Sequence, residues 1–197
     1  MCGRFTLTVD PADLQAAFDG FTFPAKFAPR FNIAPSQPIL AIPNDNKNTA
    51  DFFLWGLIPS WAKDPSMGQP PINARGETLA EKPSFRGSFK YKRCLILADG
   101  FYEWKPQPGT KTRIPHYIYL NTRQPFAFAG LWDEWHSPDG DSLLTAAIIT
   151  VAANELMAPI HDRMPAILHP SDYRQWLDPA PGTPDRLQPL LKPFPAR

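Results

Sequence analysis

Short apolar runs, separated by turns rich in proline, glycine, asparagine and aspartate, recur along most of the chain. Runs of four to eight apolar residues bounded by such turn-forming residues are typical of β-strands. A polar insert of asparagine, aspartate and lysine between two of the runs predicts a hairpin. The pattern predicts about eight short strands after an extended segment over residues 30–35. The strands are residues 38–43, 51–57, 93–98, 101–105, 114–120, 125–132, 142–150 and 166–168.

Helical patterns are few and short. Residues 10–18 predict a helix in which Asp10 is the N-cap, Pro11 lies in the first turn, and Leu14 and Phe18 share a face. Residues 153–157 and 171–177 predict two more. Because most strands follow one another directly, we expect an α+β fold, mainly antiparallel, with a barrel-like or two-sheet core.

Composition favours a folded protein with one domain over residues 1–197. Proline is abundant, with 25 of 197 residues, but aromatic and β-branched residues lie between the prolines, which argues against disorder. Only residues 178–197 read as a loosely ordered, proline-rich tail. The net charge of +1 means that a nucleic-acid partner would need a local basic groove.

Cysteine content and the absence of long apolar runs narrow the class of protein. Cys2 and Cys94 alone provide neither a disulfide framework nor the ligand spacing of a zinc site, so we expect no metal and no cofactor. No apolar run approaches the ~20 residues of a membrane span, and no amino-terminal signal region is visible. We expect a cytoplasmic monomer without a membrane partner.

The start of the chain carries the most distinctive chemistry. If an aminopeptidase removes Met1, Cys2 presents an amine and a thiol two bonds apart, a pair that reacts with aldehydes. A free α-amine has a pKa of about 7.7 to 8.0, so roughly a tenth is neutral at pH 7 and can attack a carbonyl. The thiol can then close a five-membered thiazolidine in an intramolecular step.

Several polar or aromatic residues elsewhere are candidates for a site, although each has a structural explanation too. Asn73 could orient a carbonyl and Arg75 could bind a phosphate, or the segment could be a turn that starts a helix. Glu103 lies between large apolar residues, which would raise the pKa of its carboxyl group and suit it to general acid–base catalysis. His161 could move protons or simply pair with its neighbour. Trp61 could stack on a base or belong to the core.

Taken together, these segments resemble the SOS-response-associated peptidase family, also called the abasic-site processing or SRAP domain. The resemblance covers nearly the whole chain, in the family's order. Gly76 and Leu97 depart from the family pattern, which affects local loop shape rather than reactive groups. The matching segments are Met1-Cys2-Gly3-Arg4, Asn32-Ile33-Ala34-Pro35, residues 55–61, Asn73-Ala74-Arg75-Gly76-Glu77, residues 93–104, Phe128-Ala129-Gly130-Leu131-Trp132 and His161-Asp162-Arg163-Met164-Pro165.

The resemblance implies covalent capture of abasic sites in single-stranded DNA through Cys2, as part of a DNA damage response and in association with the nucleoid. AP-lyase and thiol autopeptidase activities are implied as well. Asn73 would orient Cys2, Glu103 would move protons, and His161 would serve the sugar oxygen. The implied DNA-binding residues are Arg4, Arg75, Trp61 and Arg163.

Two other functions remain open at this point. The first is a thiol peptidase, with Cys2 as the nucleophile and His161 as the base, perhaps limited to removal of its own leading residue. The second is a nucleic-acid-binding module without a covalent step, which would use Trp61 and the arginines.

Overall fold

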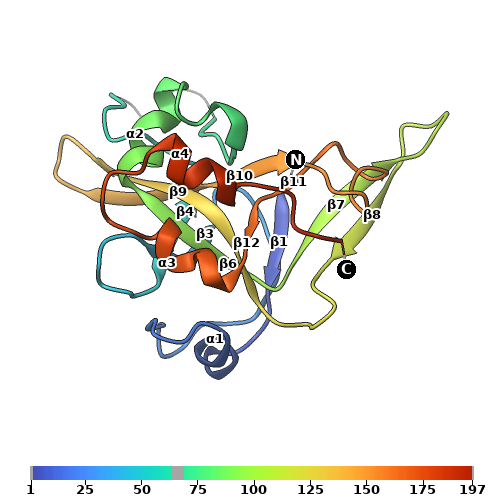
Figure 1. Cartoon of the computed structure of the whole chain (residues 1–197), viewed down its shortest axis with the longest axis horizontal. Coiled ribbons are helices and arrows are strands. Elements are labelled where there is room, and N and C mark those ends of the chain that lie inside the picture. The colour runs from blue at the N-terminus through green and yellow to red at the C-terminus, as the bar shows by residue number, and fades with distance from the viewer. Residues whose placement is uncertain (1, 64–68, 197) are drawn as a thin grey trace.

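A computed structural model describes residues 2–63 and 69–196. Two sheets dominate it (Figure 1). The smaller sheet has four strands, and each pair of adjacent strands in it is antiparallel. Its spatial order is β2 (Arg30–Ile33), β1 (Arg4–Leu7), β7 (Gly100–Pro106) and β8 (Arg113–Ile118).

The larger sheet closes on itself. Five strands form a ring in which each pairs with the next, and the ring closes because β10 pairs with β9 on one side and with β4 on the other. The β4–β10 pairing is parallel, whereas the other four pairings of the ring are antiparallel. The ring strands are β3 (Pro38–Pro43), β4 (Asp51–Trp55), β6 (Arg93–Ala98), β9 (Phe126–His136) and β10 (Ser142–Ala152).

Three short strands extend the ring. β5 (Asn73–Arg75) pairs in parallel with β10, β11 (Arg163–Pro165) pairs with β10, and β12 (Ile167–Leu168) pairs with β9. Both Arg75 and Pro165 lie opposite Thr150, so β5 and β11 flank opposite edges of the same part of β10.

Apolar side chains from both sheets form one core. Phe5 of β1 packs edge-on against Trp55 and Phe128, with ring centroids 5.1 and 5.8 Å apart, and this contact joins the small sheet to the ring. Edge-to-face pairs of this kind are worth about 0.5–1.5 kcal/mol beyond their buried area. The expected α+β fold with a barrel-like core is therefore confirmed. No helix in the described part of the chain is long and apolar enough to cross a membrane.

Helices cover the ring and were only partly predicted. The first, α1 (Pro11–Ala17), begins as expected, because the Asp10 side chain accepts a hydrogen bond from the amide of Asp13 at 2.9 Å. Residues 171–177 form a 3₁₀ turn followed by α3 (Tyr173–Trp176). Sequence reasoning missed α2 (Pro83–Tyr91), whose N-cap Lys82 makes no side-chain capping bond.

Two expectations were wrong. Residues 153–157 do not form a helix: the Asn154 side chain accepts from the Met157 amide and holds a series of turns instead. Residues 178–196 are not loose, because they contain α4 (Pro184–Leu187) and bury both Leu187 and Leu191 against the core.

A fully buried arginine fastens this carboxyl-terminal segment. Arg93 of β6 has no exposed surface, and its guanidinium donates to five main-chain carbonyl oxygens from α2, from the last residue of α3 and from the segment that follows α3. The charge is thus met by dipoles rather than by a bonded carboxylate. The five acceptors belong to Phe89, Lys90, Trp176, Asp178 and Ala180.

Candidate functional site

Cys2 lies just before β1, beside β7. Because the two strands are antiparallel with Arg4 opposite Tyr102, the residues before Arg4 run alongside those after Tyr102, among them Glu103. The Cys2 side chain is completely buried, and its thiol lies 3.7 Å from the carbonyl oxygen of Arg4. Burial, and secondly the nearby negative charge of Glu103, raise the pKa of the Cys2 thiol to about 12. The thiol is therefore protonated at neutral pH.

Asn73 holds the main chain of Cys2. It occupies the first position of β5, and its side-chain Nδ2 donates to the Cys2 carbonyl oxygen at 2.9 Å. The other end of the amide, Oδ1, is buried and makes no hydrogen bond within the described residues. A buried acceptor left in this state costs about 1–3 kcal/mol, so the geometry suits a further donor at this point.

Glu103 is a buried carboxylate on the core side of β7. Alternation along the strand places it on the same face as Phe101, and only 3% of its surface is exposed. Its Oε2 accepts a bond from the Trp104 amide at 3.3 Å. Its negative charge is, after burial, the second cause of the raised pKa of the Cys2 thiol. Cys2, Asn73 and Glu103 thus come together from three distant segments.

His161 lies in the loop between β10 and β11. Its Nδ1 is 2.9 Å from the Arg163 amide and 2.9 Å from a carboxylate oxygen of Asp162. The same nitrogen cannot accept from the amide and donate to Asp162 at once, so neutral His161 accepts from Arg163 and carries its proton on Nε2. The loop is placed near β5 only indirectly, through the shared strand β10.

The four predicted DNA-binding residues differ in availability. Trp61 is 66% exposed, whereas the neighbouring Trp55 is core. Arg75 is exposed, and Arg4 is half-buried with one guanidinium nitrogen 2.9 Å from the Gly3 carbonyl oxygen. Arg163 is already bonded to the carboxylate of Glu77.

Arg163 forms a two-pronged ion pair. Its two terminal nitrogens lie 2.6 and 2.9 Å from the carboxylate oxygens of Glu77, and one of them also donates to the Thr150 carbonyl oxygen at 2.6 Å. These hydrogen bonds hold the pKa of Glu77 below its usual value. A phosphate would have to displace Glu77 from Arg163, so this residue is better suited to tying β11 to the segment after β5.

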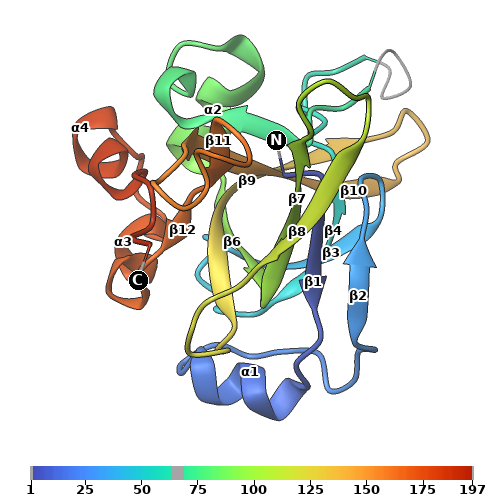
Figure 2. The ribbon, with the colours of Figure 1, turned by 90° about the vertical axis from the view of Figure 1, so that its right-hand side faces the viewer.

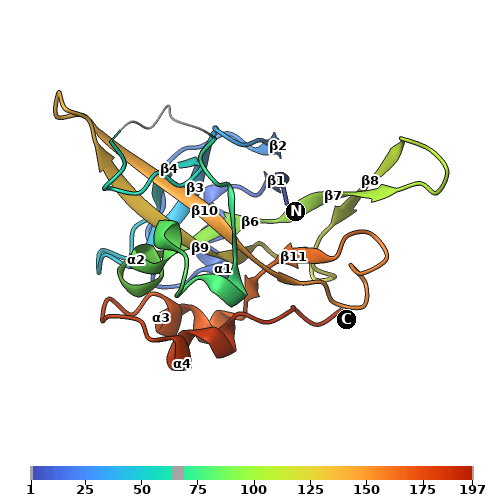
Figure 3. The same cartoon turned by 90° about the horizontal axis from the view of Figure 1, so that it is seen from above.

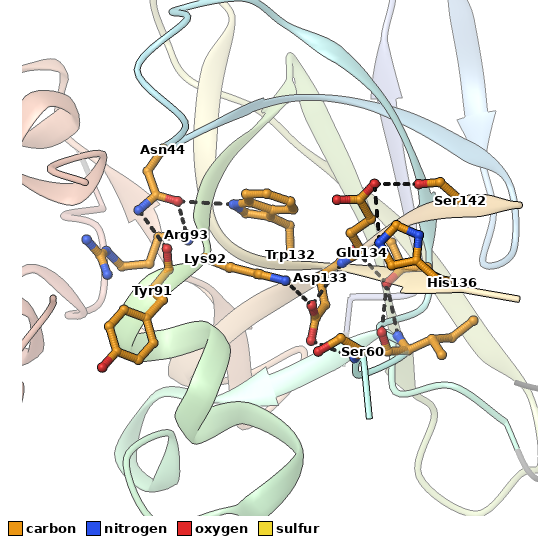
Figure 4. A network of polar contacts seen from close by, with 12 residues as sticks. Asn44, Ser60, Tyr91, Lys92, Arg93, Trp132, Asp133, Glu134, His136 and Ser142 are labelled. Carbon is orange, nitrogen blue, oxygen red and sulfur yellow. Dashed lines mark hydrogen bonds and ion pairs between the residues drawn. The ribbon is translucent and has the colours of Figure 1, made fainter. Parts of the chain in front are cut away.

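A polar network that sequence reasoning did not assign supports the loop that carries Trp61 (Figure 4). Asp133 of β9 accepts from the Lys92 ammonium at 2.5 Å and from the Ser60 amide at 2.9 Å. The Trp135 ring nitrogen donates to the Ala62 carbonyl oxygen at 2.7 Å. The loop is thus held on both sides of Trp61. The aromatic-acidic pattern of residues 132–135 was the available signal, but its partners lie in distant segments.

No group of three or more histidine, cysteine, aspartate or glutamate side chains within residues 2–63 and 69–196 is arranged to hold a metal ion. What the arrangement offers is a buried thiol, a carboxylate whose charge reaches it, and an amide that fixes the main chain between them.

Comparisons with known proteins place these features in a family. Residues 1–197 match the family described as SOS response associated peptidase (SRAP). The chain is 51% identical to the abasic site processing protein YoqW of Bacillus subtilis over its full length and 88% of that protein. It is 35% identical to the abasic site processing protein HMCES of Xenopus tropicalis, covering 90% of this chain and 66% of that one.

A solved structure has the same overall fold as this chain. The crystal structure of a protein from Bacteroides thetaiotaomicron superposes with a TM-score of 0.87 at 28% identity, covering 99% of this chain and 88% of the other. The match over the whole sequence and the shared fold together show that this chain belongs to the SRAP family.

Proposed function

We propose that this protein processes abasic sites by capturing them covalently in single-stranded DNA, through a thiazolidine formed by Cys2 after removal of Met1. The observation that carries the proposal is the convergence of Cys2, Asn73 and Glu103 at the start of β1. The relatives reported above are named abasic site processing proteins, which supports the same substrate.

The reaction balances without an oxidant or a reductant. The Cys2 amine attacks the C1′ aldehyde of the opened abasic sugar, and the adduct loses one water to give an imine. The thiol sulfur then adds to the imine carbon while its proton passes to nitrogen, which closes the ring. One water is released overall.

The order of these steps follows from the acidities. The Cys2 thiol is protonated where burial raises its pKa, whereas roughly a tenth of a free α-amine is neutral at pH 7. The amine is therefore the first nucleophile. The thiol needs a base as it adds to the imine, and we assign this role to the buried carboxylate of Glu103.

Asn73 and His161 have supporting roles in this proposal. Asn73 holds the Cys2 carbonyl and so fixes the direction in which the amine and thiol point. With its proton on Nε2, neutral His161 can donate to the sugar oxygen. Arg4, Arg75 and Trp61 would bind the flanking strand, and Arg163 would do so only by releasing Glu77.

The burial of Cys2 sets a condition on this chemistry. The side chain has no exposed surface in the structure, so an aldehyde reaches it only once this end of the chain is uncovered. Removal of Met1 is required in any case, because the Cys2 nitrogen is otherwise part of a peptide bond.

A denaturing gel tests the proposal. Protein is mixed with a single-stranded oligonucleotide carrying one abasic site, and a band that survives denaturation and needs the abasic site is expected. Cys2→Ser should lose this band yet still give an imine that borohydride traps. Cys94→Ala, at the other buried cysteine, is the matched control and should retain the band.

A second variant tests the amine. A residue inserted before Cys2 that resists aminopeptidases should abolish both the stable adduct and the trapped imine. If the blocked protein still forms the stable adduct, the terminal chemistry is wrong. Peptide hydrolysis without any DNA adduct would instead support the thiol peptidase.

A further inference from the structure

Three tyrosine rings form a continuous row on the outer face of the four-stranded sheet. Tyr102 of β7 and Tyr117 of β8 are directly opposite each other, with ring centroids 4.9 Å apart. Tyr119, just beyond β8, continues the row at 5.4 Å from Tyr117. We call Tyr102, Tyr117 and Tyr119 the tyrosine row. Figure 2 shows the four strands side by side, and Figure 3 shows the β7–β8 hairpin extending away from the ring.

The tyrosine row is not part of the core. Alternation along β7 and β8 sends Phe101 and Ile118 inward, and Ile118 packs against the core. Tyr117 and Tyr119 remain 39% and 38% exposed. Tyrosines on an exposed sheet face at this spacing offer aromatic surface that packing of the core does not use.

The rings are held in place before any ligand arrives. The Tyr117 hydroxyl lies 2.9 Å from the Thr6 hydroxyl, and it sits above Gly100, where even a single Cβ atom would come within 2.2 Å of it. The Tyr102 hydroxyl donates to the Phe31 carbonyl oxygen at 3.3 Å. Fixed rings lose little conformational entropy on binding, which favours a recognition surface.

Positive charge flanks both ends of the tyrosine row. At one end the Arg123 guanidinium lies 3.5 Å from the centroid of the Tyr119 ring. Arg123 adopts a φ of +59°, a region uncommon for residues with side chains. At the other end, Arg4 of β1 is paired with Tyr102, and Cys2 lies two residues before Arg4. The tyrosine row therefore begins beside the end of β1 that leads to Cys2, with Tyr102 on the face of β7 opposite to Glu103.

We propose that the tyrosine row binds the unpaired bases of the DNA strand that flanks the captured abasic site. Bases stack on exposed aromatic rings and on arginine planes without regard to sequence, and the two arginines complement the phosphates between them. A duplex is excluded because its base faces are already covered. This inference deepens the proposed function and rests on it for the origin of the strand.

The first experiment measures the tyrosine row independently of capture. Binding of an undamaged, fluorescein-labelled oligo-dT is followed by anisotropy for wild type, Tyr119→Ala, Tyr119→Phe and Arg123→Ala. Loss of one stacking ring should weaken binding about tenfold, whereas Tyr119→Phe, which keeps the ring, should bind like wild type. Phe52→Ala, at an exposed aromatic of β4, is the matched control and should have no effect.

The second experiment connects the tyrosine row to the capture site. Adduct formation is timed on denaturing gels with abasic oligonucleotides carrying either short or long flanks. Tyr119→Ala should slow capture of the long substrate and leave capture of the short one unchanged. Arg123→Ala lies in an exposed loop and so keeps the test valid if a tyrosine variant fails to fold.

The outcomes separate the two proposals. Wild-type binding by both Tyr119→Ala and Arg123→Ala overturns the tyrosine row, whether or not capture occurs. Binding that depends on the row in a protein that forms no adduct overturns covalent capture instead. If Tyr119→Ala alters only self-association in sedimentation, the row is a protein contact and the inference is wrong.

Discussion

Replacing the buried arginine of β6 should loosen the carboxyl-terminal segment and destabilise the whole protein. In Arg93→Met, five carbonyl oxygens lose the guanidinium as a donor, although that of Lys90 keeps the Gly182 amide. Two of the five, on Phe89 and Trp176, are in buried hydrogen bonds. Each buried acceptor left unpaired costs about 1–3 kcal/mol, or about 2–6 kcal/mol for the two. The apolar side chain recovers part of this, because a guanidinium no longer has to be desolvated.

A net loss of about 3 kcal/mol is therefore expected, which for a chain of this length lowers the melting temperature by about 6–12 °C. Urea unfolding, followed by tryptophan fluorescence and circular dichroism, measures the free energy of unfolding. Limited proteolysis should in addition show cleavage within residues 178–196 before the rest of the chain is cut.

Arg86→Met, on the exposed side of α2, is the control for loss of an arginine as such, and it should change stability by less than about 0.5 kcal/mol. The reasoning is refuted if Arg93→Met costs no more than this control. It is also refuted if the carboxyl-terminal segment keeps its protection from protease.

Three further predictions concern the site and the small sheet. Asn73→Ala frees the main chain of the terminal cysteine and should slow adduct formation on the order of tenfold or more in a timed gel assay, with little change in DNA affinity. The lowered pKa of Glu77 means that its pair with Arg163 stabilises the fold above the usual carboxyl pKa and is lost as pH falls through the lowered value. Because Glu77 is half exposed, acid titration of unfolding should show a difference from Glu77→Gln of less than about 1 kcal/mol. Gly100→Ala should displace the Tyr117 ring and cost about 1–3 kcal/mol in urea unfolding; unchanged stability would contradict the tight contact.

Local signals in the sequence were enough for the parts of the fold that depend on local chemistry. The hairpin over residues 38–55 follows from its polar insert, and α1 follows from the Asp10 cap. In contrast, α2 has no capping side chain and carries Gly87 in its interior, so its helical pattern is weak. Tertiary packing of Phe89 against Trp176 compensates, and no local pattern reveals such a contact.

For the candidate site, the sequence predicted the reactive residue but not the contacts that surround it. The reactivity of a terminal cysteine can be read from residue 2 alone. The contact between Asn73 and Cys2 spans 71 positions and depends on how β5 is placed against β10, which the sequence pattern does not encode. The tyrosine row was missed for the same reason: only the register of β7 against β8 brings Tyr102 and Tyr117 together.

The strand β10 pairs with four others, and both sides of the proposed pocket depend on it: β5 with Asn73 along one edge, and β11 with the His161 loop along the other. Neither half of the chain can therefore assemble the chemistry by itself, since the first 141 residues supply the reactive end but lack its central support. The pairings of β10 with β4 and β5 join segments far apart in the sequence and cost loop-closure entropy before they yield any contact, so folding should be slow. Splitting the gene between β9 and β10 would consequently give two inert fragments whose function returns only on reassociation.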